Sequence, residues 1–136
     1  LVPNMTKDEA VAKLKAHLDK RGFGDIEVIV SGGYSPTESP EDSVVIRAGA
    51  ATLEKAGIEY SLFPRRAGSW PGVVFTGPPL EMAAGHFGVG RGGGAHAPDE
   101  WLLIESSDPK VAGYAQQAAA FVDYLDETAR AAKTRR

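Results

Sequence analysis

The stretch around which this chain is organised is residues 88–100, Gly-Val-Gly-Arg-Gly-Gly-Gly-Ala-His-Ala-Pro-Asp-Glu. Five of its thirteen residues are glycine, and a backbone with so few β-carbons can approach a ligand closely and can adopt positive φ angles. His96 follows the glycines and precedes two carboxylates, Asp99 and Glu100. A neutral imidazole held in this way is a candidate ligand for a divalent metal. The alternative is a tight glycine loop on which His96 is merely half-exposed.

The same stretch also matches a dinucleotide-binding fingerprint, because Gly88, Gly90 and Gly93 fall at Gly-x-Gly-x-x-Gly spacing. That fingerprint must open a helix after a strand, with an acidic residue about 20 residues further on. Here the glycines run into Ala-His-Ala-Pro, and the next apolar run, residues 101–104, is typical of a strand. We therefore reject a dinucleotide site.

Composition limits the remaining function classes. The chain has 136 residues, 15 of them basic and 18 acidic, and a net charge of -3, which indicates neither a nucleic-acid surface nor a polybasic membrane patch. It has no cysteine, which fits a reducing compartment, and no apolar run near the roughly 18 residues of a membrane span. We expect a cytoplasmic protein with no nucleic-acid or membrane partner. Because the chain does not begin with methionine, we expect it to be part of a longer one.

The first third of the chain predicts one helix and one strand. Thr6 and Glu9 form a capping box that begins the helix, and Gly22 suits its left-handed end. The β-branched run at residues 25–30 predicts a strand. Residues 31–40 have the composition of a linker. We therefore expect a first domain over residues 1–35 and a second over 36–136.

The second domain predicts helices alternating with strands. Ser39 and Pro40 have the residue types of an N-cap and first position of a second helix, which Gly57 would end. Asp108 and Pro109 would cap a long final helix with an apolar stripe. The predicted strands are residues 58–63, 73–75, 82–87 and 101–105. This alternation predicts an α/β fold in which a mixed sheet is covered by the second and last helices.

Several motifs together resemble the C-terminal part of the zinc amidohydrolase and metallopeptidase family, which includes acetylornithine deacetylase, succinyl-diaminopimelate desuccinylase, carboxypeptidase G and the aminoacylases. The residues that carry the resemblance are Gly68-Ser69, the run Val73-Val74-Phe75, the glycine run, and Ala95-His96-Ala97-Pro98-Asp99-Glu100-Trp101. The family has a catalytic α/β domain interrupted by an α+β lid or dimerisation domain. By this resemblance residues 1–35 correspond to the last helix and strand of the lid.

The resemblance implies a hydrolase that uses two zinc ions to cleave an amide bond in N-acyl amino acids or small peptides. His96 would be the last metal ligand, and Gly68, Ser69, Gly93 and Gly94 would contact the substrate. The family's other ligands, from a His-x-Asp motif, a bridging aspartate, a Glu-Glu pair and a further acid, have no counterpart here. We therefore expect the chain alone to be inactive and to retain little zinc.

The chain departs from the family pattern after the Gly-Ser turn. Many members of the family have an aspartate there, where this chain has Trp70 and Pro71, and this departure concerns the substrate contact at Ser69.

We expect a homodimer, because the predicted strand at residues 25–30 would offer an unpaired edge. The alternative function is a non-catalytic domain that binds a small ligand or a protein partner through its glycine-rich loop.

Overall fold

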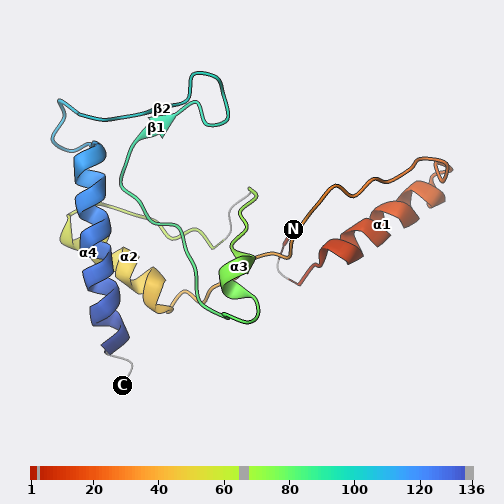
Figure 1. Cartoon of the computed structure of the whole chain (residues 1–136), viewed down its shortest axis with the longest axis horizontal. Helices are drawn as coiled ribbons and strands as arrows, with labels where there is room; N and C mark the ends of the chain where they lie inside the picture. Colours follow the sequence, from red (N-terminus) through yellow and green to blue (C-terminus); the bar gives the residue numbers. More distant parts are fainter. Residues whose placement is uncertain (3, 65–67, 134–136) are drawn as a thin grey trace. The chain divides into compact units, whose positions relative to one another are not determined.

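The computed structural model describes residues 1–2, 4–64 and 68–133 (Figure 1). Its helices are α1 (Lys7–Lys20), α2 (Val44–Lys55), α3 (Val73–Thr76) and α4 (Tyr114–Lys133), and its strands are β1 (Gly92–Gly93) and β2 (Trp101–Leu102). The two strands form an antiparallel sheet. The predicted mixture of helices and strands is thus confirmed, in a helix-rich form.

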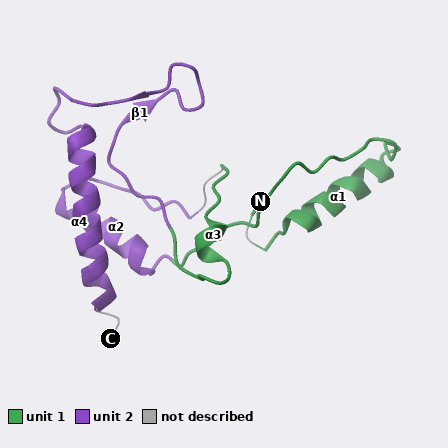
Figure 2. Cartoon of the chain, viewed as in Figure 1, with its two compact units in different colours: residues 1–40, 66–84 green, residues 41–65, 85–136 purple. Residues whose placement is uncertain are grey.

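The chain divides into two compact units, coloured separately in Figure 2. The first comprises residues 1–40 and 66–84 and carries α1 and α3. The second comprises residues 41–65 and 85–136 and carries α2, α4 and the small sheet. The boundary that the sequence predicts after residue 35 stays a prediction.

Helix α1 begins and ends where its sequence predicts. The Thr6 hydroxyl accepts the Glu9 amide at 3.2 Å, and the Glu9 carboxylate accepts the Thr6 amide at 2.9 Å. These bonds, chiefly the one from the Thr6 amide, hold the pKa of Glu9 below its ordinary value. At the other end Gly22 has φ 83°, and the Gly22 and Phe23 amides bond back to the Asp19 and Leu18 carbonyls. This is the Schellman pattern that a glycine stop allows.

Two predicted strands of the first unit are wrong. Residues 73–75 lie in α3, because Gly72 is already helical (φ -59°, ψ -19°) and its carbonyl accepts the Phe75 amide at 2.9 Å. Pro71 pre-sets a φ that suits a helical turn, and this local turn replaces the pairing that β-branched residues favour. Residues 25–30 begin in a turn, continue without regular secondary structure and join no ladder within the described chain.

Helix α2 begins later than the sequence predicts. Ser39 is not its N-cap, because the Ser39 hydroxyl donates to the Ala84 carbonyl at 2.7 Å and accepts the Ala84 amide at 2.9 Å. The N-cap is instead Ser43, whose side chain makes no capping bond. Its hydroxyl is buried and has no partner among the described residues. The predicted end is confirmed, since Gly57 has φ 67° and closes a second Schellman pattern.

Helices α2 and α4 pack against each other (Figure 1), rather than covering the multi-stranded sheet that the sequence predicts. Ala48 of α2 is fully buried, and Gly49 lies next to the Phe87 and Tyr124 rings, where a β-carbon would make ordinary van der Waals contacts at 3.5 and 3.8 Å. Phe87 stacks on Tyr124 of α4 at 4.5 Å between ring centroids and meets Phe121 edge-on at 5.6 Å. The partial burial of Tyr124 raises the pKa of its phenol.

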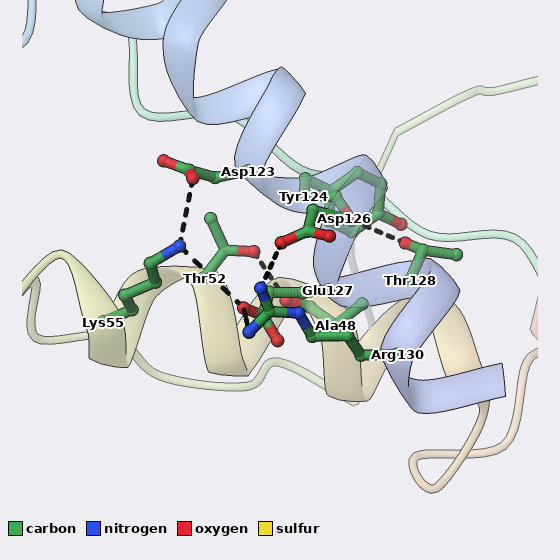
Figure 3. A network of polar contacts seen from close by, with 9 residues as sticks. All are labelled: Ala48, Thr52, Lys55, Asp123, Tyr124, Asp126, Glu127, Thr128 and Arg130. Atoms are coloured by element: carbon green, nitrogen blue, oxygen red, sulfur yellow. Dashed lines mark hydrogen bonds and ion pairs between the residues drawn. The ribbon is translucent and has the colours of Figure 1, made fainter. Parts of the chain in front are cut away.

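Ion pairs tie the same two helices together, as Figure 3 shows. Lys55 of α2 lies 3.1 Å from the Asp123 carboxylate and 4.0 Å from that of Glu127. Arg130 lies 3.6 Å from Glu127 and 2.7 Å from Asp126. The Lys55 pairs join the two helices, whereas the Arg130 pairs lie within α4. The pairs are largely exposed except at Glu127, so each contributes little stability.

The remaining predicted boundaries also shift. Asp108 does not cap α4; its carboxylate accepts the Lys110 amide at 2.9 Å and so closes a local turn, and α4 begins at Tyr114. The predicted strand at residues 101–105 shortens to β2. Residues 58–63 and 82–87 are not strands in the described structure.

Many large apolar side chains stay exposed. On α4, Val122 and Leu125 are 68% and 67% exposed, and Ala48 is the one fully enclosed apolar residue of the described chain. Among the described helices, none is both long enough and apolar enough to cross a membrane.

Candidate functional site

The glycine-rich stretch folds into a short hairpin. Gly92 of β1 pairs with Leu102 of β2, and Gly93 pairs with Trp101. The Leu103 amide extends the pairing by donating to the Arg91 carbonyl at 2.9 Å. Residues 94–100, which include His96, are therefore the loop that joins the two strands.

Trp101 explains why the first strand of the hairpin is made of glycine. A β-carbon on Gly93 would lie 2.9 Å from the indole Nε1 of Trp101, and one on Gly92 would lie 2.7 Å from the Trp101 carbonyl oxygen. Both distances are shorter than real β-carbons tolerate. The indole thus lies directly on the glycine backbone, a close approach that only glycine permits.

Two consecutive turns build the tip of the hairpin. The Ala97 amide donates to the Gly94 carbonyl at 2.8 Å, and the Glu100 amide donates to the Ala97 carbonyl at 3.2 Å. His96 is the third residue of the first turn and has φ 65°, a position at which turns of this kind prefer glycine or asparagine. A left-handed backbone costs a residue with a β-carbon about 1–2 kcal/mol, although histidine is found there more often than most residues.

His96 presents an exposed side chain. Its backbone amide points to the Glu100 carboxylate, with the nitrogen 3.4 Å from Oε2. The imidazole has no hydrogen-bond or ion-pair partner among the residues that the structure describes. Both ring nitrogens are therefore accessible to a ligand.

The described residues do not complete a metal site around this imidazole. Within residues 1–2, 4–64 and 68–133, no group of three or more His, Cys, Asp or Glu side chains is arranged to hold a metal ion. A zinc site needs three or four protein ligands. Among the described residues His96 therefore lacks the partners that a zinc site needs.

Gly68 and Ser69 belong to the first unit, whereas Gly93, Gly94 and His96 lie together on the hairpin of the second. Gly68 has φ 147°, which favours glycine. The Ser69 hydroxyl is hydrogen-bonded to the phenol of Tyr34. The two halves of the predicted substrate contact thus belong to different units.

Residues outside the predicted set anchor the hairpin to α4. On one arm the Gln117 side chain covers Gly90 so closely that a β-carbon there would lie 1.4 Å from its Oε1. On the other arm the Ile104 carbonyl accepts the Tyr114 amide at 2.9 Å and leaves no room for a β-carbon on Gly113. No local motif marks these contacts, because each joins residues that are far apart on either side of a loop.

Comparison of the chain with models of known protein families, with curated proteins and with solved structures gave no match. The resemblance to the zinc amidohydrolases therefore stays a prediction that rests on the quoted residues.

Proposed function

We propose that this chain is the C-terminal part of a two-zinc metallohydrolase that cleaves an amide bond in N-acyl amino acids or small peptides, and that His96 is one of its metal ligands. The observation that carries the proposal is the conformation of His96. Its imidazole is exposed and unpartnered within the described structure, and its backbone is left-handed at φ 65°.

The unfavourable left-handed backbone of His96 supports a functional role for its side chain. The three residues at positions 92–94 are all glycine, yet the position in the turn that favours glycine most carries a histidine. A residue that costs about 1–2 kcal/mol in this conformation is retained more readily where its side chain has a task.

The bound zinc ions would supply an activated water and would polarise the scissile carbonyl. This chain would contribute the His96 imidazole, and Gly93 and Gly94 on the same hairpin are the candidate substrate contacts next to it. In the first unit, the Tyr34 phenol orients the Ser69 hydroxyl, next to Gly68, as a further candidate contact for the substrate. The protein is proposed to be a cytoplasmic homodimer.

The genomic reading frame upstream of Leu1 is the first test. A His-x-Asp motif and a Glu-Glu pair within the few hundred codons before Leu1 would supply the absent ligands and support the proposal. A start codon close to Leu1 would contradict it and favour the non-catalytic alternative, in which the glycine-rich loop binds a small ligand or a protein partner.

The protein that this frame encodes provides the second test. His96→Ala should remove most amidohydrolase turnover and lower the bound zinc, because one ligand is lost. His17→Ala is the matched control, since His17 is an exposed residue of α1 in the other unit, and it should leave both unchanged. Full zinc occupancy and normal turnover in His96→Ala would refute the metal assignment.

A further inference from the structure

Glu100 lies at the base of the hairpin tip, four residues after His96, and its carboxylate faces the backbone amide of His96. We propose that Glu100 is a positioning residue that holds His96 in its left-handed conformation and so fixes the direction of the imidazole. The purpose of this clamp, the orientation of a metal ligand, rests on the proposed function. The clamp itself is a conformational property of the hairpin.

The backbone of Glu100 is held in place by its neighbours, which suits a residue that positions His96. Its amide is bonded to the Ala97 carbonyl at 3.2 Å, and the next residue, Trp101, is paired with Gly93 in the sheet. The backbone of Glu100 is thus held on both sides, and its carboxylate is presented from a fixed point. His96 is the element of the tip that needs support, because its φ of 65° is unfavourable for a residue with a β-carbon.

The neighbouring carboxylate does not make the same contact. The Asp99 backbone packs against Gly94, where a β-carbon would lie 3.1 Å from the Asp99 carbonyl oxygen. The Asp99 side chain is exposed and makes no hydrogen bond to any residue that the structure describes. The two adjacent acids therefore have different roles, although their sequence position suggests a pair.

The strength expected of the clamp is modest. A carboxylate is a stronger acceptor for an amide than a neutral oxygen, but 3.4 Å is long for an N–H···O bond. We therefore expect an effect near that of an ordinary hydrogen bond, which corresponds to about threefold to tenfold in the opening equilibrium of the His96 amide.

Nuclear magnetic resonance of the complete 136-residue chain without metal tests this proposal. The measured quantities are the hydrogen-exchange rate of the His96 amide and the coupling between its amide and α protons, which reports φ. In Glu100→Ala the exchange should become about threefold to tenfold faster and the coupling should change. In Glu100→Gln, which keeps a neutral acceptor, both should lie between those of the Ala variant and the native chain.

Asp99→Asn is the matched control and should leave both quantities unchanged. Unchanged exchange in Glu100→Ala, with the contact between Trp101 and Gly93 still present, would overturn the clamp, as would an equal effect of Asp99→Asn. If Glu100→Ala loses the Trp101–Gly93 contact, Glu100→Gln decides: faster exchange with that contact intact supports the clamp, and unchanged exchange refutes it.

Failure of the clamp can be distinguished from failure of the proposed function. The clamp is measured without metal or substrate, so a negative result would leave the zinc assignment of His96 standing. Conversely, a full-length protein that keeps its zinc in His96→Ala would refute the metal role without changing the exchange rates in this chain.

Discussion

His96→Gly should give a more stable chain than His96→Ala, although glycine normally destabilises folded structure relative to alanine. Both variants remove the imidazole, so they differ only in the β-methyl group of one residue and in its effect on the backbone conformation. At φ 65° alanine keeps the left-handed penalty of about 1–2 kcal/mol, whereas glycine does not. Glycine also lowers the free energy of unfolding by about 0.5–1 kcal/mol, because it gives the unfolded chain more conformational freedom. The expected difference is about 1 kcal/mol in favour of glycine, or roughly fivefold in the unfolding constant.

Urea unfolding followed by Trp101 fluorescence measures this difference, in a Trp70→Phe background so that one indole reports. Trp101 is the appropriate probe because its ring lies on the Gly93 backbone. The two variants should have the same slope and different midpoints, which indicates a change of stability alone. Ala95→Gly is the control: Ala95 does not have a positive φ, so glycine there should destabilise the chain.

Equal midpoints, or a His96→Ala variant more stable than His96→Gly, would refute the left-handed assignment of His96 and with it the strain argument for function. In the full-length protein the same two variants should both lose turnover. A stabilising substitution that removes activity is the signature of a residue kept for its chemistry rather than for stability.

The remaining predictions concern the helices and the state of association. Thr6→Ala should speed amide exchange in the first turn of α1 about fivefold, since a capping bond contributes about 1 kcal/mol. Ser43→Ala should not speed exchange in α2, because Ser43 makes no capping bond and its buried hydroxyl has no partner among the described residues. The Thr6 bonds lower the pKa of Glu9 in the folded chain. The contribution of Glu9 to the stability of α1 is therefore complete above the ordinary pKa of an unfolded glutamate and is lost as the pH falls through the lower folded pKa. Circular dichroism should show α1 losing helicity in acid, and Glu9→Gln should remove this pH dependence. A double-mutant cycle of Lys55→Met and Asp123→Asn should give a coupling of about 0.5 kcal/mol that fades in 1 M salt; a coupling above about 2 kcal/mol would contradict the exposed geometry. Sedimentation at micromolar concentration should show the predicted homodimer, and a clean monomer would contradict it.

Features set by neighbouring residues were predictable from the sequence. The capping box of Thr6 and Glu9 and the stops at Gly22 and Gly57 depend on bonds within a few residues, and the structure has all of them. His96, Gly93 and Gly94 lie on one hairpin because they are neighbours along the chain, whereas the roles that the family resemblance implies for them stay predictions.

Features that need a distant partner were not predictable. The preference of β-branched residues for strands reflects packing on a paired, half-buried surface, and no local signal says whether a partner strand is present. Residues 73–75 satisfy their amides in a turn instead. Tyr34 bonds to Ser69, which is 35 positions away in the sequence, and Gln117 of α4 lies against Gly90 of the hairpin. The local sequence around these residues therefore does not predict the two contacts.

The hairpin depends on a succession of contacts that begins in the helix pair. Lys55 ties α2 to α4, the first turn of α4 holds the hairpin arms at Gly90 and Ile104, and the sheet supports the loop that carries His96. A ligand on a loop is positioned only as well as the elements beneath it. Yet α4 keeps a stripe of exposed apolar side chains, Val122 and Leu125 among them, and an uncovered apolar surface of this kind is typical of a contact with another polypeptide. Because that stripe is on the helix that bears the hairpin, covering it would stabilise the support of His96. Under the proposed metal role of His96, association and metal affinity should therefore rise together.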